Sequence, residues 1–216
     1  MAKEFKPNHL DREARSEYDL LWEVPGMRKV GLFFTSLLLM SAAFAGCAQQ
    51  TPPEETAPPD NGKVAFAITS PAFVDGAEIP VKYSCDGENV SPPLDWSEVP
   101  TGTASFALIL DDPDAPVGVF THWVIFNLPP DTSGLPEAVP KDGTLASGAL
   151  QGKNGGGSIR YIGPCPPRGT PHHYRFTLYA LDKSLDLATG ASKEQVLQAM
   201  QGHILAQSQL VGLYQR

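Results

Sequence analysis

Three aspartates and a histidine lie close together near the middle of the chain. Asp111, Asp112 and Asp114 belong to the segment DDPDAP, and His122 follows in the segment THWV. Carboxylates and imidazoles can bind a metal ion, transfer protons or hold a small charged ligand. Two prolines in the connecting segment fix backbone angles, so we expect a shaped loop that holds these side chains in place.

A second group of reactive side chains precedes a later apolar segment. Residues 163–173 read GPCPPRGTPHH and contain Cys165, His172 and His173. Their prolines leave few backbone conformations open. Rigid walls that carry imidazoles and carboxylates predict a small cavity with preset polar groups.

The segments beside both groups have the pattern of β-strands. Residues 104–110 are continuously apolar, which favours a central strand covered on both faces. Residues 121–128, 173–181 and 203–214 are further strand segments, and the first of them ends at two prolines. Antiparallel pairing of residues 104–110 with 121–128 would bring the aspartates to the same sheet edge as His122.

Alternating apolar residues predict two more half-buried strands, at residues 64–69 and 79–83. One helix is predicted after Ser192, which can cap it in a capping box with Gln195. Gly202 would end this helix. The sequence therefore predicts one mainly β domain over residues 63–216, with an antiparallel sheet and one short late helix.

The first 62 residues have the composition of a targeting segment and a tether. Residues 27–46 predict a signal peptide, because two basic residues precede a short apolar segment and then small residues. Residues 1–26 are polar, which favours Met27 as the true start; a genuine cytoplasmic extension before an internal anchor is the alternative. Residues 47–62 are rich in proline and polar residues and predict a disordered linker.

Cys47 follows Phe44-Ala45-Gly46, which resembles a bacterial lipobox. Diacylation of Cys47 would anchor an exported protein to a membrane of the cell envelope. The residues before it also suit ordinary signal cleavage, which would give a soluble secreted or periplasmic product. The formal charge of −8 and the scattered basic residues exclude nucleic acid as a partner.

Five segments, in this order, resemble the phosphatidylethanolamine-binding protein family, which includes animal Raf kinase inhibitor proteins and plant flowering regulators. They are SPAFVDGAEIPVKYSCDGENVSPPLDW, LILDDPDAP, HWVIFNLP, GPCPPRGTPHHYRFTLYALD and GHILAQSQLVGLY. The forms CDGENVSPPL and GPCPP resemble the bacterial and archaeal branch. The resemblance implies a central antiparallel sheet packed against a smaller sheet, with a non-enzymatic anion pocket at one end and neither metal nor cofactor.

Carried over position by position, the resemblance implies one set of ligand-binding residues for a small anion or phospholipid headgroup. They are Asp112, Asp114, His122, Cys165, Pro166 and His172. The family usually has His-Arg-Tyr where this chain has His-His-Tyr at residues 172–174. The resemblance also places Cys85 and Cys165 near the pocket, where they form either a disulfide or two separate thiols.

The same residues would also allow three other functions. A metal-dependent hydrolase could use Asp112, Asp114, His122 and His172, but no fixed ligand spacing such as HExxH occurs. A nucleophilic enzyme could use Cys165 with His172, but Pro166 has no N–H to offer an oxyanion hole. A protein-interaction module that inhibits a protease or kinase is the third. We expect a binding protein and no enzyme.

Overall fold

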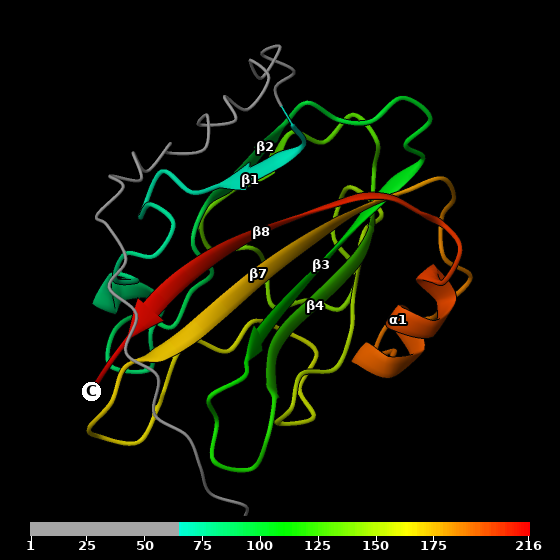
Figure 1. The fold of residues 1–216 in the computed structure, drawn as a ribbon. Coiled ribbons are helices and arrows are strands. Elements are labelled where there is room, and N and C mark those ends of the chain that lie inside the picture. Colours follow the sequence, from blue (N-terminus) through cyan, green and yellow to red (C-terminus); the bar gives the residue numbers. More distant parts are fainter. Residues whose placement is uncertain (1–64) are drawn as a thin grey trace, which may run out of the picture. The chain divides into compact units, whose positions relative to one another are not determined.

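The computed structural model describes residues 65–216, and the predictions for the signal peptide, Cys47 and the linker lie outside these residues. These residues form a five-stranded and a three-stranded antiparallel sheet. The larger sheet has the order β6-β4-β3-β7-β8, made of β6 (Leu150–Gln151), β4 (Phe120–Leu128), β3 (Ser105–Asp112), β7 (His172–Leu181) and β8 (Ile204–Tyr214). The smaller sheet is β1 (Ala67–Thr69), β2 (Leu94–Ser97) and β5 (Gly134–Leu135). Figure 1 labels β3, β4, β7 and β8 of the larger sheet and β1 and β2 of the smaller one.

The larger sheet is covered on both faces, as the apolar segment at residues 104–110 predicts. Along β3, Phe106 and Leu108 point to a core that also contains Trp96 of the smaller sheet. Ala107 and Ile109 point to a second core, which contains the buried residues of the helix. Side chains of a strand alternate between the two faces, so the central part of β3, residues 106–110, is apolar at every position.

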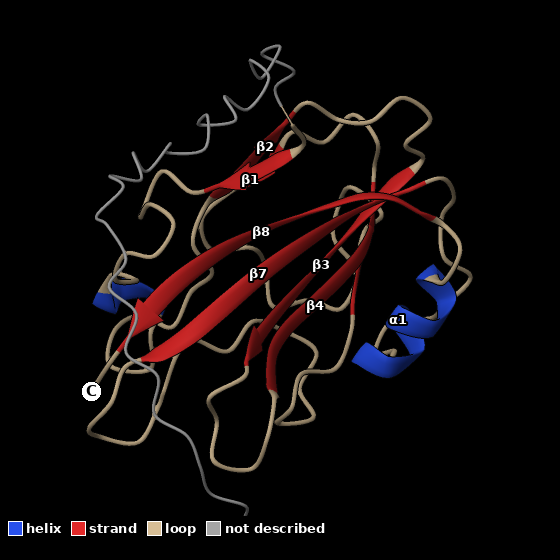
Figure 2. Cartoon of the chain, viewed as in Figure 1, coloured by secondary structure: helices blue, strands red, loops and turns tan. Residues whose placement is uncertain are grey.

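The helix α1 (Lys193–Met200) lies on the other side of the larger sheet from β1 and β2, as Figure 2 shows. Ser192 accepts a hydrogen bond from the Gln195 backbone, and the Gln195 side chain accepts one from the Ser192 N–H. This confirms the predicted capping box. Val196 and Met200 bury the apolar side of the helix against the sheet. Within residues 65–216, no helix combines the length and the apolarity needed to cross a membrane.

The prediction of a strand at residues 79–83 is wrong. Val81–Tyr83 form a short 3-10 helix, η2. Pro80 begins it with a fixed φ and no N–H, and the Ser84 N–H and hydroxyl both donate to the Val81 carbonyl. The chain therefore turns where alternation alone predicts extension.

The order of the strands brings three strand ends together. β3 pairs in antiparallel fashion with both β4 and β7, so its last residues lie beside the first residues of both neighbours. Asp112 is opposite Phe120 of β4, and Asp111 is opposite Arg175 of β7. The β3–β4 loop and the segment before β7 thus emerge from one end of the sheet.

Candidate functional site

A cavity of about 240 Å³ lies at this end of the larger sheet. Its walls come from the end of β3, the β3–β4 loop, the start of β4, the segment before β7 and the start of β7. The lining residues are Asp112, Ala115, Pro116, Val117, Phe120, His122, Ile162, Gly163, Cys165, Pro166, Pro167, His172 and Tyr174. Five of the six residues that the family resemblance implies as ligand-binding therefore share one cavity.

A buried carboxylate orients the ring of His172. The Asp112 Oδ2 atom lies 2.7 Å from His172 Nδ1, and both side chains are almost fully buried. The second carboxylate oxygen accepts the backbone N–H of Asp114 at 2.9 Å, which holds the start of the loop. With Nδ1 committed to the carboxylate, Nε2 is the ring nitrogen of His172 that a ligand in the cavity can reach.

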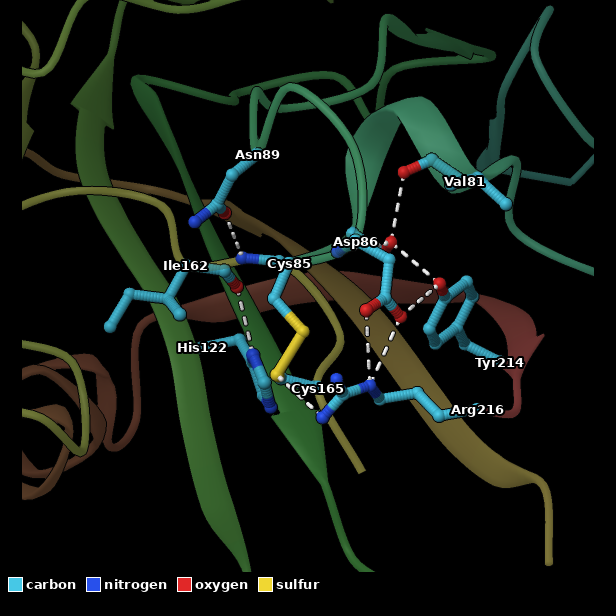
Figure 3. The surroundings of a disulfide bond; sticks show 11 residues. Val81, Cys85, Asp86, Asn89, His122, Ile162, Cys165, Tyr214 and Arg216 are labelled. Atoms are coloured by element: carbon cyan, nitrogen blue, oxygen red, sulfur yellow. Dashed lines mark hydrogen bonds and ion pairs between the residues drawn. A yellow bond between two sulfur atoms is a disulfide. The ribbon is translucent and has the colours of Figure 1, made fainter. Parts of the chain in front are cut away.

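His122 is oriented in the same way, but by a neutral partner. Its Nδ1 lies 2.8 Å from the Ile162 carbonyl oxygen, and the His122 carbonyl accepts the Ile162 N–H in return. Figure 3 marks the contact between His122 and Ile162 with a dashed line. The rings of Phe120 and Tyr174 pack edgewise against the imidazole. Burial lowers the pKa of His122, more than the nearby carboxylates raise it. The ring is therefore neutral near pH 7, with Nδ1 as donor and Nε2 as acceptor.

Tyr174 contributes a polar group that the sequence analysis missed. Its side chain is fully buried, and its hydroxyl makes no hydrogen bond of regular geometry among the residues that the structure describes, although Asp112 and the Cys165 backbone lie close enough to influence its pKa. Burial, and next the charge of Asp112, raise the pKa of the phenol, so the hydroxyl stays protonated and can donate. The signal available in the sequence was its position two residues after His172, which places both side chains on the same face of a strand.

The three aspartates of the loop do not act as one cluster. Asp111 pairs with Lys193 at 2.6 Å and accepts the Thr121 hydroxyl. Asp114 lies outside the cavity lining, and its Oδ2 accepts the backbone N–H and contacts Nδ1 of His173, both at 2.8 Å. These bonds from His173 lower the pKa of Asp114. Each carboxylate thus has a different partner, and only Asp112 faces the cavity.

A disulfide fixes the wall opposite the β3–β4 loop. Cys85 and Cys165 are joined, with their Cα atoms 5.4 Å apart. The Cys85 N–H donates to the Pro164 carbonyl, and Asn89 accepts the Gly163 N–H. Figure 3 shows this disulfide beside His122 and Ile162. The cross-link therefore holds the cavity-lining GPCPP turn against the segment that follows η2.

The cavity offers hydrogen-bonding groups inside mostly apolar walls. Within residues 65–216, no three His, Cys, Asp or Glu side chains are arranged to hold a metal ion. Asp112 and His172 bind each other, and Asp114 lies with His173. Two imidazole nitrogens and a phenol hydroxyl at the floor are suited to bind a small polar group by hydrogen bonds.

Two packed antiparallel sheets with a small cavity at one end of the larger sheet define the class of domain. The family model described as Phosphatidylethanolamine-binding protein matches residues 69–215, and the chain belongs to this family. It is 59% identical over 145 residues to a UPF0098 protein of Methanothermobacter thermautotrophicus, an alignment that covers 67% of this chain and 95% of the relative. The resemblance inferred from the sequence is confirmed, including its prokaryotic branch.

Two further relatives bear on fold and location. Mycobacterium tuberculosis LppC, named as a candidate lipoprotein, is 40% identical over 195 residues, which cover 84% of this chain and 94% of LppC. The crystal structure of Escherichia coli YbcL, titled a member of the mammalian PEBP family, matches with a TM-score of 0.66 at 34% identity. That match covers 70% of this chain and 98% of YbcL, which confirms the predicted fold.

Proposed function

We propose that the cavity binds a small anionic group, such as the phosphate of a lipid headgroup or a carboxylate, without catalysing a reaction. The observation that carries this proposal is the convergence of His122, His172 and Tyr174 on one cavity, each with a hydrogen-bonding atom left for a ligand. A buried hydroxyl without a partner costs free energy, and a ligand oxygen that accepts from it removes that cost.

Anion binding at this site is coupled to protons. A neutral imidazole whose Nδ1 already donates can only accept at Nε2. Its Nε2 lone pair repels an anionic oxygen of the ligand unless a proton lies between that nitrogen and that oxygen. The proton arrives either on the ligand, as in a phosphate monoanion, or on the ring. Asp112 balances the positive charge of a protonated His172 at 2.7 Å. Affinity should therefore rise as the pH falls towards the range in which imidazoles protonate.

The size and lining of the cavity favour a headgroup and not a whole lipid. A volume of about 240 Å³ is below the range of ordinary drug-sized pockets. Phe120, Ile162 and the prolines of the rim keep water away from the polar floor, which strengthens each hydrogen bond made there. Long acyl chains of a bound lipid would remain outside.

Binding can be tested by calorimetry with the full-length protein, titrated with inorganic phosphate, phosphoethanolamine and glycerophosphoethanolamine. We expect His172→Ala to weaken binding at least about tenfold, since a charge-assisted hydrogen bond contributes about 1.5–3 kcal/mol. His203→Ala is the matched control, because His203 also pairs with a carboxylate, Asp182, but lies outside the cavity. Equal binding by wild type and His172→Ala would refute the site.

We also propose that the protein is exported and anchored through a lipid on Cys47. The Cys85–Cys165 disulfide supports an oxidising compartment, and the name of LppC supports a lipid anchor in a relative. Mass spectrometry of the mature N-terminus decides this point. A diacylated Cys47 is expected, whereas an unmodified N-terminus would show the soluble secreted or periplasmic alternative.

A further inference from the structure

The disulfide is placed where its chemistry can affect the cavity. Cys165 is itself a lining residue, and it is exposed to solvent, whereas Cys85 is partly exposed. A small thiol from solution can therefore approach this bond, unlike a disulfide enclosed in a core. One of its two sulfurs belongs to the wall of the proposed anion site.

The two sulfurs have different electrostatic surroundings. The Arg216 guanidinium lies 3.7 Å from the Cys165 Sγ atom and also pairs with Asp86 at 3.1 Å. Figure 3 shows this guanidinium beside the disulfide. A nearby cation stabilises a thiolate and makes that sulfur the better leaving group in disulfide exchange. Cys165 is therefore the sulfur on which negative charge is better accommodated.

We propose that the Cys85–Cys165 disulfide is a site of thiol–disulfide exchange with small thiols, and that its state sets the affinity of the cavity for anions. In the first step a thiolate attacks Cys85 Sγ, a new S–S bond forms there, and the electron pair of the broken bond leaves on Cys165 Sγ. A second thiolate then attacks the external sulfur of the mixed disulfide, which releases the oxidised small disulfide. The Cys85 thiolate takes up a proton, and Cys165 stays a thiolate beside Arg216. The balance is two small thiols oxidised to one small disulfide, with one protein thiol and one protein thiolate formed and one proton released to solvent.

Opening the bond should weaken anion binding for two reasons. The Cys165 thiolate places negative charge in the wall of the cavity, where it repels an anion. The segment that carries Pro166 and Pro167 also loses its covalent attachment. Among the described residues its remaining backbone bonds to other segments are few: the Gly163 N–H donates to Asn89, Pro164 accepts from Cys85, and Gly169 accepts from the Gln215 side chain.

This coupling rests on the proposed anion binding and can be tested separately from it. Full-length protein is titrated with phosphoethanolamine by calorimetry, first oxidised and then reduced with dithiothreitol, with circular dichroism recorded on both forms. We expect the dissociation constant to rise about 5- to 50-fold on reduction, within the usual range of coupling between sites. By thermodynamic reciprocity, saturating phosphoethanolamine must shift the dithiol–disulfide equilibrium of the protein by the same factor towards the disulfide.

The outcomes separate the two proposals. Equal affinities of the oxidised and reduced forms, with the fold retained, would overturn the coupling and leave the proposed function standing. An oxidised protein that binds none of the anions would overturn both. If reduction unfolds the domain, the equilibrium shift measured with excess anion still tests the coupling, and its absence overturns it.

The site of thiol attack and the role of Arg216 can be measured directly. Limiting glutathione followed by acid quenching and peptide mass spectrometry should find the mixed disulfide on Cys85; an adduct mainly on Cys165 would overturn the assigned leaving group. Arg216→Gln should slow reduction by glutathione about threefold or more. Lys141→Gln removes an exposed cation outside the cavity lining and should leave that rate unchanged. Equal rates for wild type and Arg216→Gln would contradict the role of the guanidinium.

Discussion

Replacing Tyr174 by phenylalanine gives a sharp test of the site, because stability and binding should move in opposite directions. The change removes one buried oxygen that has no partner among the described residues and keeps the ring that packs against His122. An unsatisfied buried hydroxyl costs about 1–3 kcal/mol, so Tyr174→Phe should leave the empty domain as stable as wild type or more stable by about 1 kcal/mol.

Binding should respond in the opposite direction. A hydrogen bond from a neutral donor to a charged acceptor contributes about 1.5–3 kcal/mol, which corresponds to roughly a 10- to 150-fold loss of affinity for phosphate. Urea unfolding gives the free energy of unfolding without ligand, and calorimetry gives the affinity for phosphate and glycerophosphoethanolamine.

Tyr161→Phe is the matched control for this substitution. Tyr161 is also buried, but its hydroxyl donates to the Tyr83 carbonyl at 2.8 Å. Its removal leaves that carbonyl unpaired and should cost about 1–3 kcal/mol of stability. The reasoning is refuted if Tyr174→Phe destabilises the domain as much as Tyr161→Phe, or if it binds phosphate with unchanged affinity.

Three further predictions concern pH, the cavity wall and the helix cap. Burial holds the pKa of His122 below its ordinary value in the folded domain. As the pH drops through about 6.5, His122 therefore takes up a proton in the unfolded chain before it does so in the folded one, and the free energy of unfolding should fall. Urea unfolding from pH 7.5 to 5 should show a shallower fall for His122→Asn than for wild type. Gly163→Ala should weaken phosphate binding and destabilise the domain by about 1–3 kcal/mol in calorimetry and urea unfolding, because the new Cβ would collide with the Tyr83 carbonyl oxygen. Ser192→Ala should cost about 1 kcal/mol of stability in the same urea assay, through loss of the α1 cap, and leave phosphate binding unchanged.

The long strands were predictable because each is a long stretch of sequence rich in apolar residues. The segment at 104–110, apolar apart from Ser105, has few stable placements other than the middle of a sheet covered on both faces. Once that strand pairs with residues 121–128, Asp112 and His122 must lie at one end. The position of His172 in the same cavity came from the family resemblance, because no local pattern specifies which strand lies on the other side of β3.

The remaining features depend on contacts that local patterns do not contain. The strands β5 and β6 have two residues each, too few to show a period. Tyr174 lies on the apolar face of β7, so the pattern predicts a core residue, and only the structure reveals that it also lines the cavity and carries a buried hydroxyl. Asp114 resembles Asp112 in sequence context, but the path of the chain brings it to His173.

The charges at the site indicate which anions suit it best. None of the cavity-lining residues within 65–216 is a lysine or arginine, so positive charge can come only from the two imidazoles. The carboxylate of Asp112 lies 2.7 Å from His172 and offsets the charge of that ring whenever it carries a proton, and the pKa of His122 is lowered. A doubly charged phosphate would therefore leave at least one excess negative charge in surroundings of low polarity, even with both imidazoles protonated, which is costly. A singly charged group, such as a phosphodiester or a carboxylate, needs only the donors at the floor and at most one proton on His122, and is the better match.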